Sequence, residues 1–227
     1  MTRRLVPRTL FESRSQATDT IHQVIAMVYG VAVGFAILLV WQQLDEAEAT
    51  AQREASNVES LYRIAEQLPG SERDQVQGLS RSYARVVAEE EWPLLASGQA
   101  SSQAQGAADD LRGSIQSFEP QTMGEQALYA QMLTKIDELY ENRELRLLES
   151  QEGVPPLVWT VLVITGVITV AFTYLLETES LRTHVLRVAA LTVVVALSLY
   201  TVHFIEHPFV GDVQVGPEAF EMVLDRI

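Results

Sequence analysis

A histidine-containing motif near the C-terminus is the part of this sequence that comes closest to a catalytic pattern. His203, Glu206 and His207 match H-x-x-E-H, in which two histidines hold zinc and a glutamate serves a peptidase as its base. Pro208 follows at once, however, and only a short tail remains to build a substrate cleft. We therefore interpret the three residues as polar groups closing an apolar segment, and we predict no enzyme, no metal and no cofactor.

Other chemistry is excluded by composition. The 227-residue chain has no cysteine, which rules out disulfides, iron–sulfur clusters, thiolate zinc sites and cysteine nucleophiles. It has no P-loop, G-x-G-x-x-G or G-x-S-x-G motif. The net charge of −14 argues against a nucleic-acid partner, since phosphate binding needs clustered cations.

Apolar residues are concentrated in three uncharged or nearly uncharged segments. The segments are Val24–Trp41, Leu157–Leu176 and Val185–Ile205, and Arg187 is the charge in the third. Each is long enough to cross a hydrocarbon core of ~30 Å at ~1.5 Å per helical residue. We therefore predict an all-α integral membrane protein with three transmembrane helices. The predicted parts are an N-tail over 1–20, a first span over 21–44, a helical bundle over 45–154, a second span over 155–176, a loop over 177–184, a third span over 185–207 and a C-terminal tail over 208–227.

The segment between the first two spans is acidic and helical. Residues 45–154 carry 21 acidic and 9 basic side chains. Apolar residues continue from the first span at steps of three and four, and no helix breaker occurs before Pro69-Gly70. We therefore expect the first span to continue as one long stalk helix. The stripe that supports this comprises Ala47, Ala51, Ala55, Val58, Leu61, Ala65 and Leu68.

Capping and breaking signals divide the rest of the bundle. Ser71 with Asp74 predicts one helix start, and Thr122 with Glu125 predicts another. Residues 97–108 are rich in Ser, Gln, Gly and Ala, and we expect a loop there. Pro93 should bend or end its helix, and Trp92 should pack against the helix of Leu139 and Tyr140. Gly216-Pro217 predicts a short amphipathic helix in the C-terminal tail.

The charges flanking the spans indicate an orientation. Arginines gather before the first span, and Arg182 and Arg187 lie at the turn between the second and third. Asp45, Glu46 and Glu48 follow the first span directly, so this end is acidic. By the positive-inside rule we expect the N-tail in the cytoplasm and the bundle outside an inner membrane. Ala47-Glu48-Ala49 matches a signal-peptidase site, but the apolar stretch before it is too long and too late, and we expect no cleavage.

Polar and small residues within the spans have two interpretations. Gly30 and Gly34 form a G-x-x-x-G pattern, and Thr165, Thr169 and Thr173 recur every fourth residue, as in helix–helix packing. On the third span a stripe at steps of three and four comprises Thr192, Ala196, Tyr200, His203 and His207, with Glu206 beside it. Such a stripe serves either packing or a polar pathway, and three spans enclose a pore only in a homo-oligomer.

Several motifs resemble the bestrophin-like family of bacterial membrane proteins, over about residues 25–225. The sharpest are Glu91-Trp92-Pro93, Asn142-Arg143 with Arg146, and His207-Pro208-Phe209 followed by Gly211 and Pro217. The resemblance implies an ion channel or transport role, because bestrophins are oligomeric anion channels. It also implies a cytosolic helical domain, opposite to the orientation that the charges predict. Family members often begin with an extra hydrophobic span, whereas residues 1–20 here are polar and basic.

Two functions follow from these observations. The first is a homo-oligomeric ion channel, with Thr192, Tyr200, His203, Glu206 and His207 lining its pathway. Asp45, Glu46 and Glu48 would form an acidic vestibule that concentrates cations. The alternative is a membrane sensor or interaction protein whose bundle senses a ligand or binds a partner. The expected partners are the lipid bilayer, further copies of the chain and small ions.

Overall fold

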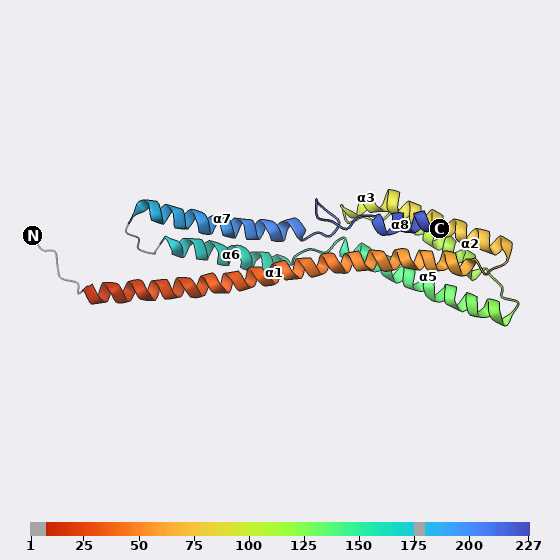
Figure 1. The fold of residues 1–227 in the computed structure, drawn as a ribbon, viewed down its shortest axis with the longest axis horizontal. Coiled ribbons are helices and arrows are strands. Elements are labelled where there is room, and N and C mark those ends of the chain that lie inside the picture. The colour runs from red at the N-terminus through yellow and green to blue at the C-terminus, as the bar shows by residue number, and fades with distance from the viewer. Residues whose placement is uncertain (1–7, 175–179) are drawn as a thin grey trace, which may run out of the picture. The chain divides into compact units, whose positions relative to one another are not determined.

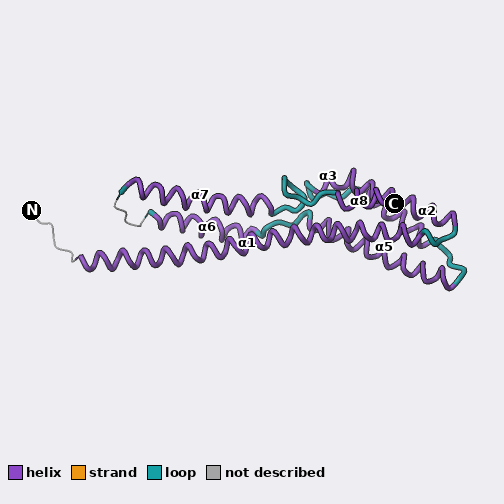
Figure 2. Tube along the Cα trace, in the orientation of Figure 1, coloured by secondary structure: helices purple, strands orange, loops and turns teal. Residues whose placement is uncertain are grey.

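The computed structural model describes residues 8–174 and 180–227 and shows an all-helical protein (Figure 1). The described residues form helices, loops and turns and contain no strand (Figure 2). Three helical segments have the length and composition to cross a membrane: Thr20–Ala65, Pro156–Thr173 and Leu181–Ile205. The predicted all-α class and three membrane-length helices are therefore confirmed.

The chain divides into two compact units. The first, which we call the membrane unit, comprises Met1–Trp41 and Gly153–Glu206. The second, which we call the helical unit, comprises Gln42–Glu152 and His207–Ile227. Helix α1 (Arg8–Ala65) contributes its first part to one unit and its second part to the other.

In the membrane unit, α1 packs with α6 (Pro156–Thr173) and α7 (Leu181–Ile205). The three helices meet at Gly166, where a Cβ atom would lie 3.1 Å from Val195 and 3.2 Å from the ring of Tyr29. A glycine therefore allows this close approach. Helix α7 begins at Leu181 behind the capping hydroxyl of Ser180, so the loop predicted to reach residue 184 is shorter. The remainder of that predicted loop, up to residue 179, lies outside the described residues.

Most of the apolar surface of the membrane unit is uncovered. Only 22% of the most apolar window of α1 and of α6, and 17% of that of α7, is buried inside the protein. Exposed apolar patches of this extent are not stable in water. Lipid or other protein copies must therefore cover these helices.

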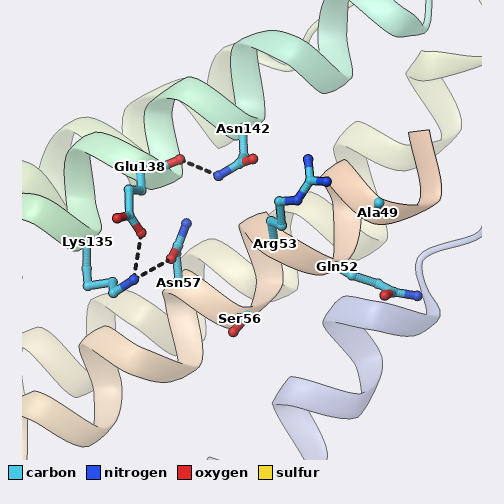
Figure 3. Close-up of a pocket in the computed structure, with 8 residues that line it drawn as sticks. All are labelled: Ala49, Gln52, Arg53, Ser56, Asn57, Lys135, Glu138 and Asn142. Atoms are coloured by element: carbon cyan, nitrogen blue, oxygen red, sulfur yellow. Dashed lines mark hydrogen bonds and ion pairs between the residues drawn. The ribbon is translucent and has the colours of Figure 1, made fainter. Parts of the chain in front are cut away.

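The helical unit combines the second part of α1 with six further segments. They are α2 (Gly70–Val86), the π-helical turn η1 (Val87–Glu91), α3 (Trp92–Leu95), α4 (Ser102–Gln116), α5 (Met123–Glu149) and α8 (Glu218–Arg226). A polar groove between α1 and α5 is lined by Arg53, Asn57 and Lys135, among others (Figure 3).

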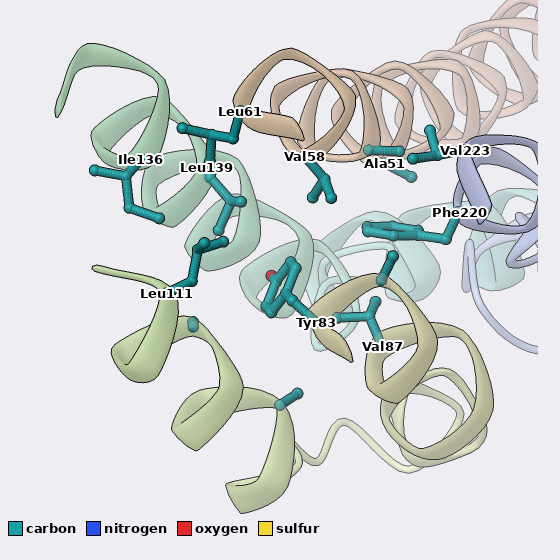
Figure 4. Packing of buried hydrophobic residues seen from close by; sticks show 14 of the residues in the cluster. Ala51, Val58, Leu61, Tyr83, Val87, Leu111, Ile136, Leu139, Phe220 and Val223 are labelled. Carbon is teal, nitrogen blue, oxygen red and sulfur yellow. The ribbon is translucent and has the colours of Figure 1, made fainter. Parts of the chain in front are cut away.

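The core of the helical unit follows the predicted apolar stripe of α1. Every member of that stripe from Ala47 to Leu68 is at most 5% exposed. Figure 4 shows Ala51, Val58 and Leu61 facing Tyr83 of α2 and Leu139 of α5. Phe220 and Val223 of α8 close the same core. The three- and four-residue periodicity thus identified the buried face of α1.

Two of the predicted boundaries in this unit are wrong. Helix α4 occupies most of the segment expected to be a loop, because Ala and Gln favour helices and Ser101 caps the N-terminus. The Ser101 hydroxyl accepts hydrogen bonds from the backbone N–H groups of Gln103 and Ala104. Helix α2 starts at Gly70 without a side-chain cap, and Ser71 donates to Glu72 instead of capping with Asp74.

Other local predictions agree with the structure. The capping box of Thr122 and Glu125 is present at the start of α5. Pro93 lies in the first turn of α3, a position where proline is common, and the π-helical turn η1 directly precedes this helix. The helical path therefore widens before Pro93 and continues to Leu95, rather than ending at Trp92.

Candidate functional site

A group of polar side chains lies at the C-terminal end of α7 in the membrane unit. The Glu206 carboxylate is 6% exposed and accepts a hydrogen bond of 2.7 Å from Nε1 of Trp159 on α6. Its other oxygen lies 2.5 Å from Nδ1 of His203. Trp159 and His203 also contact each other edge to face, with ring centroids 6.1 Å apart. The three side chains form one hydrogen-bonded group that joins α6 to α7.

The other polar residues predicted on α7 are exposed in the protomer. Tyr200 is 61% exposed and stacks on Phe204, and the side chain of His203 is 69% exposed. Thr192 is exposed too, and its hydroxyl donates to the carbonyl of Val188 one turn earlier. Thr192 and Tyr200 are therefore exposed in the protomer, whereas His203, although exposed, also packs on Trp159 of α6.

The second histidine of the predicted motif does not share the helix of the first. Helix α7 ends at Ile205 with Glu206 as its cap, so the prediction that both imidazoles lie on one helix face is wrong. His207 belongs to the helical unit, where its Nδ1 lies 3.3 Å from the carbonyl oxygen of Glu152. Among the residues that the structure describes, no group of three or more His, Asp or Glu side chains is placed to hold a metal ion.

The residues predicted for helix packing fall into two groups. Thr169 and Thr173 of α6 are buried, Thr165 is half-buried, and the Thr173 hydroxyl lies 3.1 Å from Nε2 of His22 on α1. Gly30 and Gly34 are exposed, and a Cβ atom added at either would meet nothing within 4 Å. Packing at the two glycines would therefore involve a helix outside the protomer, and it stays a prediction.

The three acids predicted to form a vestibule follow Trp41 on α1. Asp45, Glu46 and Glu48 are all exposed, on the side of α1 that the alanine stripe does not use. Their carboxylates are therefore available to solvent in the helical unit.

The residues that carry the family resemblance come together inside the helical unit. Arg146 is fully buried and binds Glu54 of α1 through two hydrogen bonds of 2.7 and 3.0 Å. The same guanidinium reaches Glu91 of η1 at 3.2 Å, and Arg143 binds the other oxygen of Glu91 at 2.9 Å. Two arginines thus balance two carboxylates, as a buried cluster requires.

Tyr83 completes this buried cluster. Burial raises the pKa of the Tyr83 hydroxyl well above its usual range, and the neighbouring Glu54 carboxylate raises that pKa further. The phenol therefore stays protonated and donates to Glu54 at 2.5 Å. Burial alone would lower the pKa of Arg146, but the Glu54 carboxylate outweighs it and the pKa is raised, so the guanidinium stays charged.

Trp92 packs beside the charged cluster, against the C-terminal segment. Its ring contacts Phe209 and Phe220, with centroids 5.8 and 5.7 Å away, and the Arg146 guanidinium lies 5.1 Å above it. Trp92 Nε1 donates to the carbonyl of Val215 at 3.0 Å. Trp92 thus contacts α5, the helix of Leu139 and Tyr140, through Arg146, and it also packs against Phe209 and Phe220 of the C-terminal segment.

The remaining family residues shape the loop that presents Phe209. Pro208 is buried and its carbonyl accepts from the N–H of Val215 at 2.7 Å. Gly211 has φ of +100°, which favours glycine, and Pro217 precedes the first residue of α8. Asn142 is 9% exposed and its amide donates to the backbone carbonyl of Glu138. The residues of the resemblance are thus structural neighbours in one unit.

Fold and site together define a helical membrane protein with a charged helical unit inserted between its first and second spans. The sequence matches the bestrophin-like domain family over residues 1–220, and the chain belongs to that family. Its fold is similar to the crystal structure of a mutant of a bacterial bestrophin homolog from Klebsiella pneumoniae, with a TM-score of 0.70. The two sequences are 12% identical, and the match covers 91% of this chain and 85% of that one. A comparison with curated proteins found no matching relative.

Sequence reasoning missed Glu54 as a member of the buried cluster. Glu54 lies between Ala51 and Val58 at steps of three and four, so it occupies a core position of α1. Arg143 and Arg146 occupy the corresponding positions of α5, next to Leu139. A charge at a core position of a helix was the signal that could have identified the pairing.

Proposed function

We propose that the protein is a homo-oligomeric ion channel or transport-like protein of the inner membrane. Membership of the bestrophin-like family and the fold shared with a bestrophin homolog support this proposal. Three membrane-length helices with mostly uncovered apolar surfaces support it as well.

The observation that carries the proposal is the exposed polar stripe of α7. Thr192, Tyr200 and His203 are exposed in the protomer, within a helix whose other exposed residues are mostly apolar. Polar side chains that face lipid are unfavourable, so such a face belongs against another helix or against water. A single protomer cannot enclose an aqueous pathway with three spans. Several copies with α7 facing a common axis would satisfy both requirements.

The group of Trp159, His203 and Glu206 would control charge at one end of this pathway. Trp159 fixes the orientation of the Glu206 carboxylate, and the side chain of His203 is exposed beside it. Histidine has an unperturbed pKa of ~6.5, so its charge changes in the physiological range. Permeation should therefore change between about pH 8 and pH 5.

Orientation and ion preference follow from the charges outside the spans. Arg182 and Arg187 near the start of α7 favour a cytoplasmic location for that end, and hence an external helical unit. The exposed acids Asp45, Glu46 and Glu48 would concentrate cations, whereas the bestrophin relationship favours anions. These two indications disagree, so a flux measurement must determine which ion is transported.

Reconstitution into liposomes tests the proposal directly. Flux of sodium, potassium and chloride is measured at several pH values, with protein-free liposomes as the control. We expect flux of at least one ion, and a double variant His203→Ala/His207→Ala should flatten the pH dependence. Absence of flux for all three ions at every pH would contradict the proposal.

The alternative of a sensor or interaction protein is supported by the polar groove of the helical unit, which has room for a small ligand. Purification in mild detergent separates the two functions. A stoichiometric partner protein would favour the sensor, and a homo-oligomer without other proteins would favour the channel.

A further inference from the structure

A groove on the helical unit has the composition of an anion-binding site. It lies between α1 and α5, has a volume of about 520 Å³ and is open to solvent on one side (Figure 3). Small-molecule sites typically have volumes of ~300–1,000 Å³. Size alone therefore permits a small organic ligand here.

Helical register brings the polar side chains of the groove together. Arg53 and Asn57 lie one turn apart on α1, on a face beside the buried alanine stripe. Lys135, Glu138 and Asn142 follow at steps of three and four on the facing side of α5. Ala49 adds little volume next to Arg53, and this leaves the groove open.

Arg53 is an exposed cation that the Glu149 carboxylate attracts without forming an ion pair with it, in a unit where acids outnumber bases more than two to one. In the part of the chain that the structure describes, Arg53 forms no hydrogen bond or ion pair, whereas Arg63, Arg73, Arg112, Arg143 and Arg146 each bind a carboxylate. Figure 3 shows its guanidinium pointing into the groove beside Asn142. A planar guanidinium with unused donors suits a carboxylate or phosphate group.

Two buried amides form the floor of the groove. Asn57 is 6% exposed and Asn142 is 9% exposed, yet both line the cavity. The Lys135 ammonium binds Glu138 at 2.6 Å and the Asn57 oxygen at 3.4 Å, so it is held at the end of the groove away from Arg53. The Asn57 oxygen thus faces Lys135, and its amide nitrogen is directed toward the space beside Arg53.

We propose that this groove binds a small organic oxyanion, with a carboxylate or phosphate group on Arg53. The amides of Asn57 and Asn142 would bind the polar remainder of the molecule. Glu138 binds Lys135, so Arg53 is the cation among the described lining residues that has no ion pair. This ligand site is independent of ion flux through the spans.

The test is isothermal titration calorimetry on the full chain purified in detergent. Succinate and glycerol 3-phosphate are the two probes, which distinguish carboxylate from phosphate, and sodium chloride at equal ionic strength is the control. We expect saturable binding of at least one probe. Arg53→Ala should weaken this binding on the order of ten- to a hundred-fold, as loss of a charged hydrogen bond does. Arg85→Ala removes an exposed arginine outside the groove and should leave the affinity unchanged.

A second variant, Asn57→Ala, removes the buried amide without changing the charge. It should weaken the same probe by a smaller factor than Arg53→Ala. Absence of saturable binding of either probe, or equal affinity in the parent and Arg53→Ala, would overturn the proposal. A changed oligomeric state of Arg53→Ala, with probe binding intact, would also overturn it and would make the groove a contact between protomers.

Discussion

The two parts of helix α1 differ in which kind of residue they expose. In the membrane unit its exposed residues are apolar, such as Met27 at 72% and Phe35 at 67% exposure. In the helical unit its exposed residues are polar, and its buried residues are alanines, Val58, Leu61 and the polar side chains of Thr50, Glu54 and Asn57. Apolar residues in the first part of α1 therefore indicate an apolar environment outside the protein. Apolar residues in the second part indicate the face that packs into the core of the helical unit.

The two units also differ in where their charged side chains lie. The helical unit buries two arginines and two glutamates completely or nearly so, each with a partner. The membrane unit keeps its exposed helix surfaces almost free of charge and gathers its buried polar groups at Glu206 and Thr173. The helical unit thus depends on exact pairing of charges, while the membrane unit depends on close helix packing.

The largest effect is expected from breaking the charged cluster. Arg146→Met leaves Glu54 and Glu91 without their shared guanidinium, and unfolding should become easier by about 3–5 kcal/mol. Thermal unfolding measured by circular dichroism reports the change. Adding Glu54→Gln to the same variant should restore part of the loss, and a stability equal to the parent in Arg146→Met would show that the pairing is dispensable.

Overpacking should distinguish the membrane unit from a loosely packed set of spans. Gly166→Val places methyl groups against Val195 and Tyr29 and should destabilise the protein by ~1–3 kcal/mol. Gly34→Val is the matched control, since space is open there within the protomer. Equal melting temperatures for the two variants in detergent would contradict close packing at Gly166.

Loss of a helix cap should have a smaller effect. Ser101→Ala removes the acceptor for two backbone N–H groups of α4 and should lower stability by ~1 kcal/mol. Ser97→Ala, a substitution of an exposed serine just before α4, serves as the control for thermal unfolding. A change below the error of the measurement would mean that the α4 terminus is held by other contacts.

The smallest effect concerns a pH-dependent carboxylate at the end of α5. Burial raises the pKa of Glu149, and the nearby Glu46 and Glu152 carboxylates raise it further, against the opposing hydrogen bond from Thr50. Its contribution to stability is therefore present below the unfolded pKa of ~4.3 and is lost as the pH rises through the higher folded pKa. Glu149→Gln should be more stable than the parent at pH 7 by a few tenths of a kcal/mol, after allowance for solvent screening.

That gain should vanish near pH 4, where the parent carboxylate is protonated in both states. Glu141→Gln removes an exposed charge from the same helix and controls for the net charge. A gain that is the same at pH 4 and pH 7 would assign the effect to charge repulsion across the unit instead of to burial of Glu149.

Features that depend on residues close in sequence could be predicted better than contacts between residues far apart in sequence. The apolar spans, the alanine stripe of α1 and the Thr122–Glu125 cap all depend on residues close in sequence, and the structure contains them. The partners of Trp92 and the pairing of Glu54 with Arg146 join residues far apart in sequence, and periodicity alone could not select them. The segment around Ser101 was misjudged because its composition suits both a loop and a helix.

Cysteine accessibility tests the central claim, that the polar stripe of α7 lines an aqueous pathway. The chain has no cysteine, so Thr192→Cys, Tyr200→Cys and His203→Cys can be made singly in the native background. Val194→Cys and Leu197→Cys are the controls, because both positions are exposed on α7 but lie outside the stripe. We predict that a membrane-impermeant thiol reagent modifies the three stripe variants in liposomes and reduces their ion flux, while the two controls are not modified. Modification of the controls alone, or of neither set, would contradict the account.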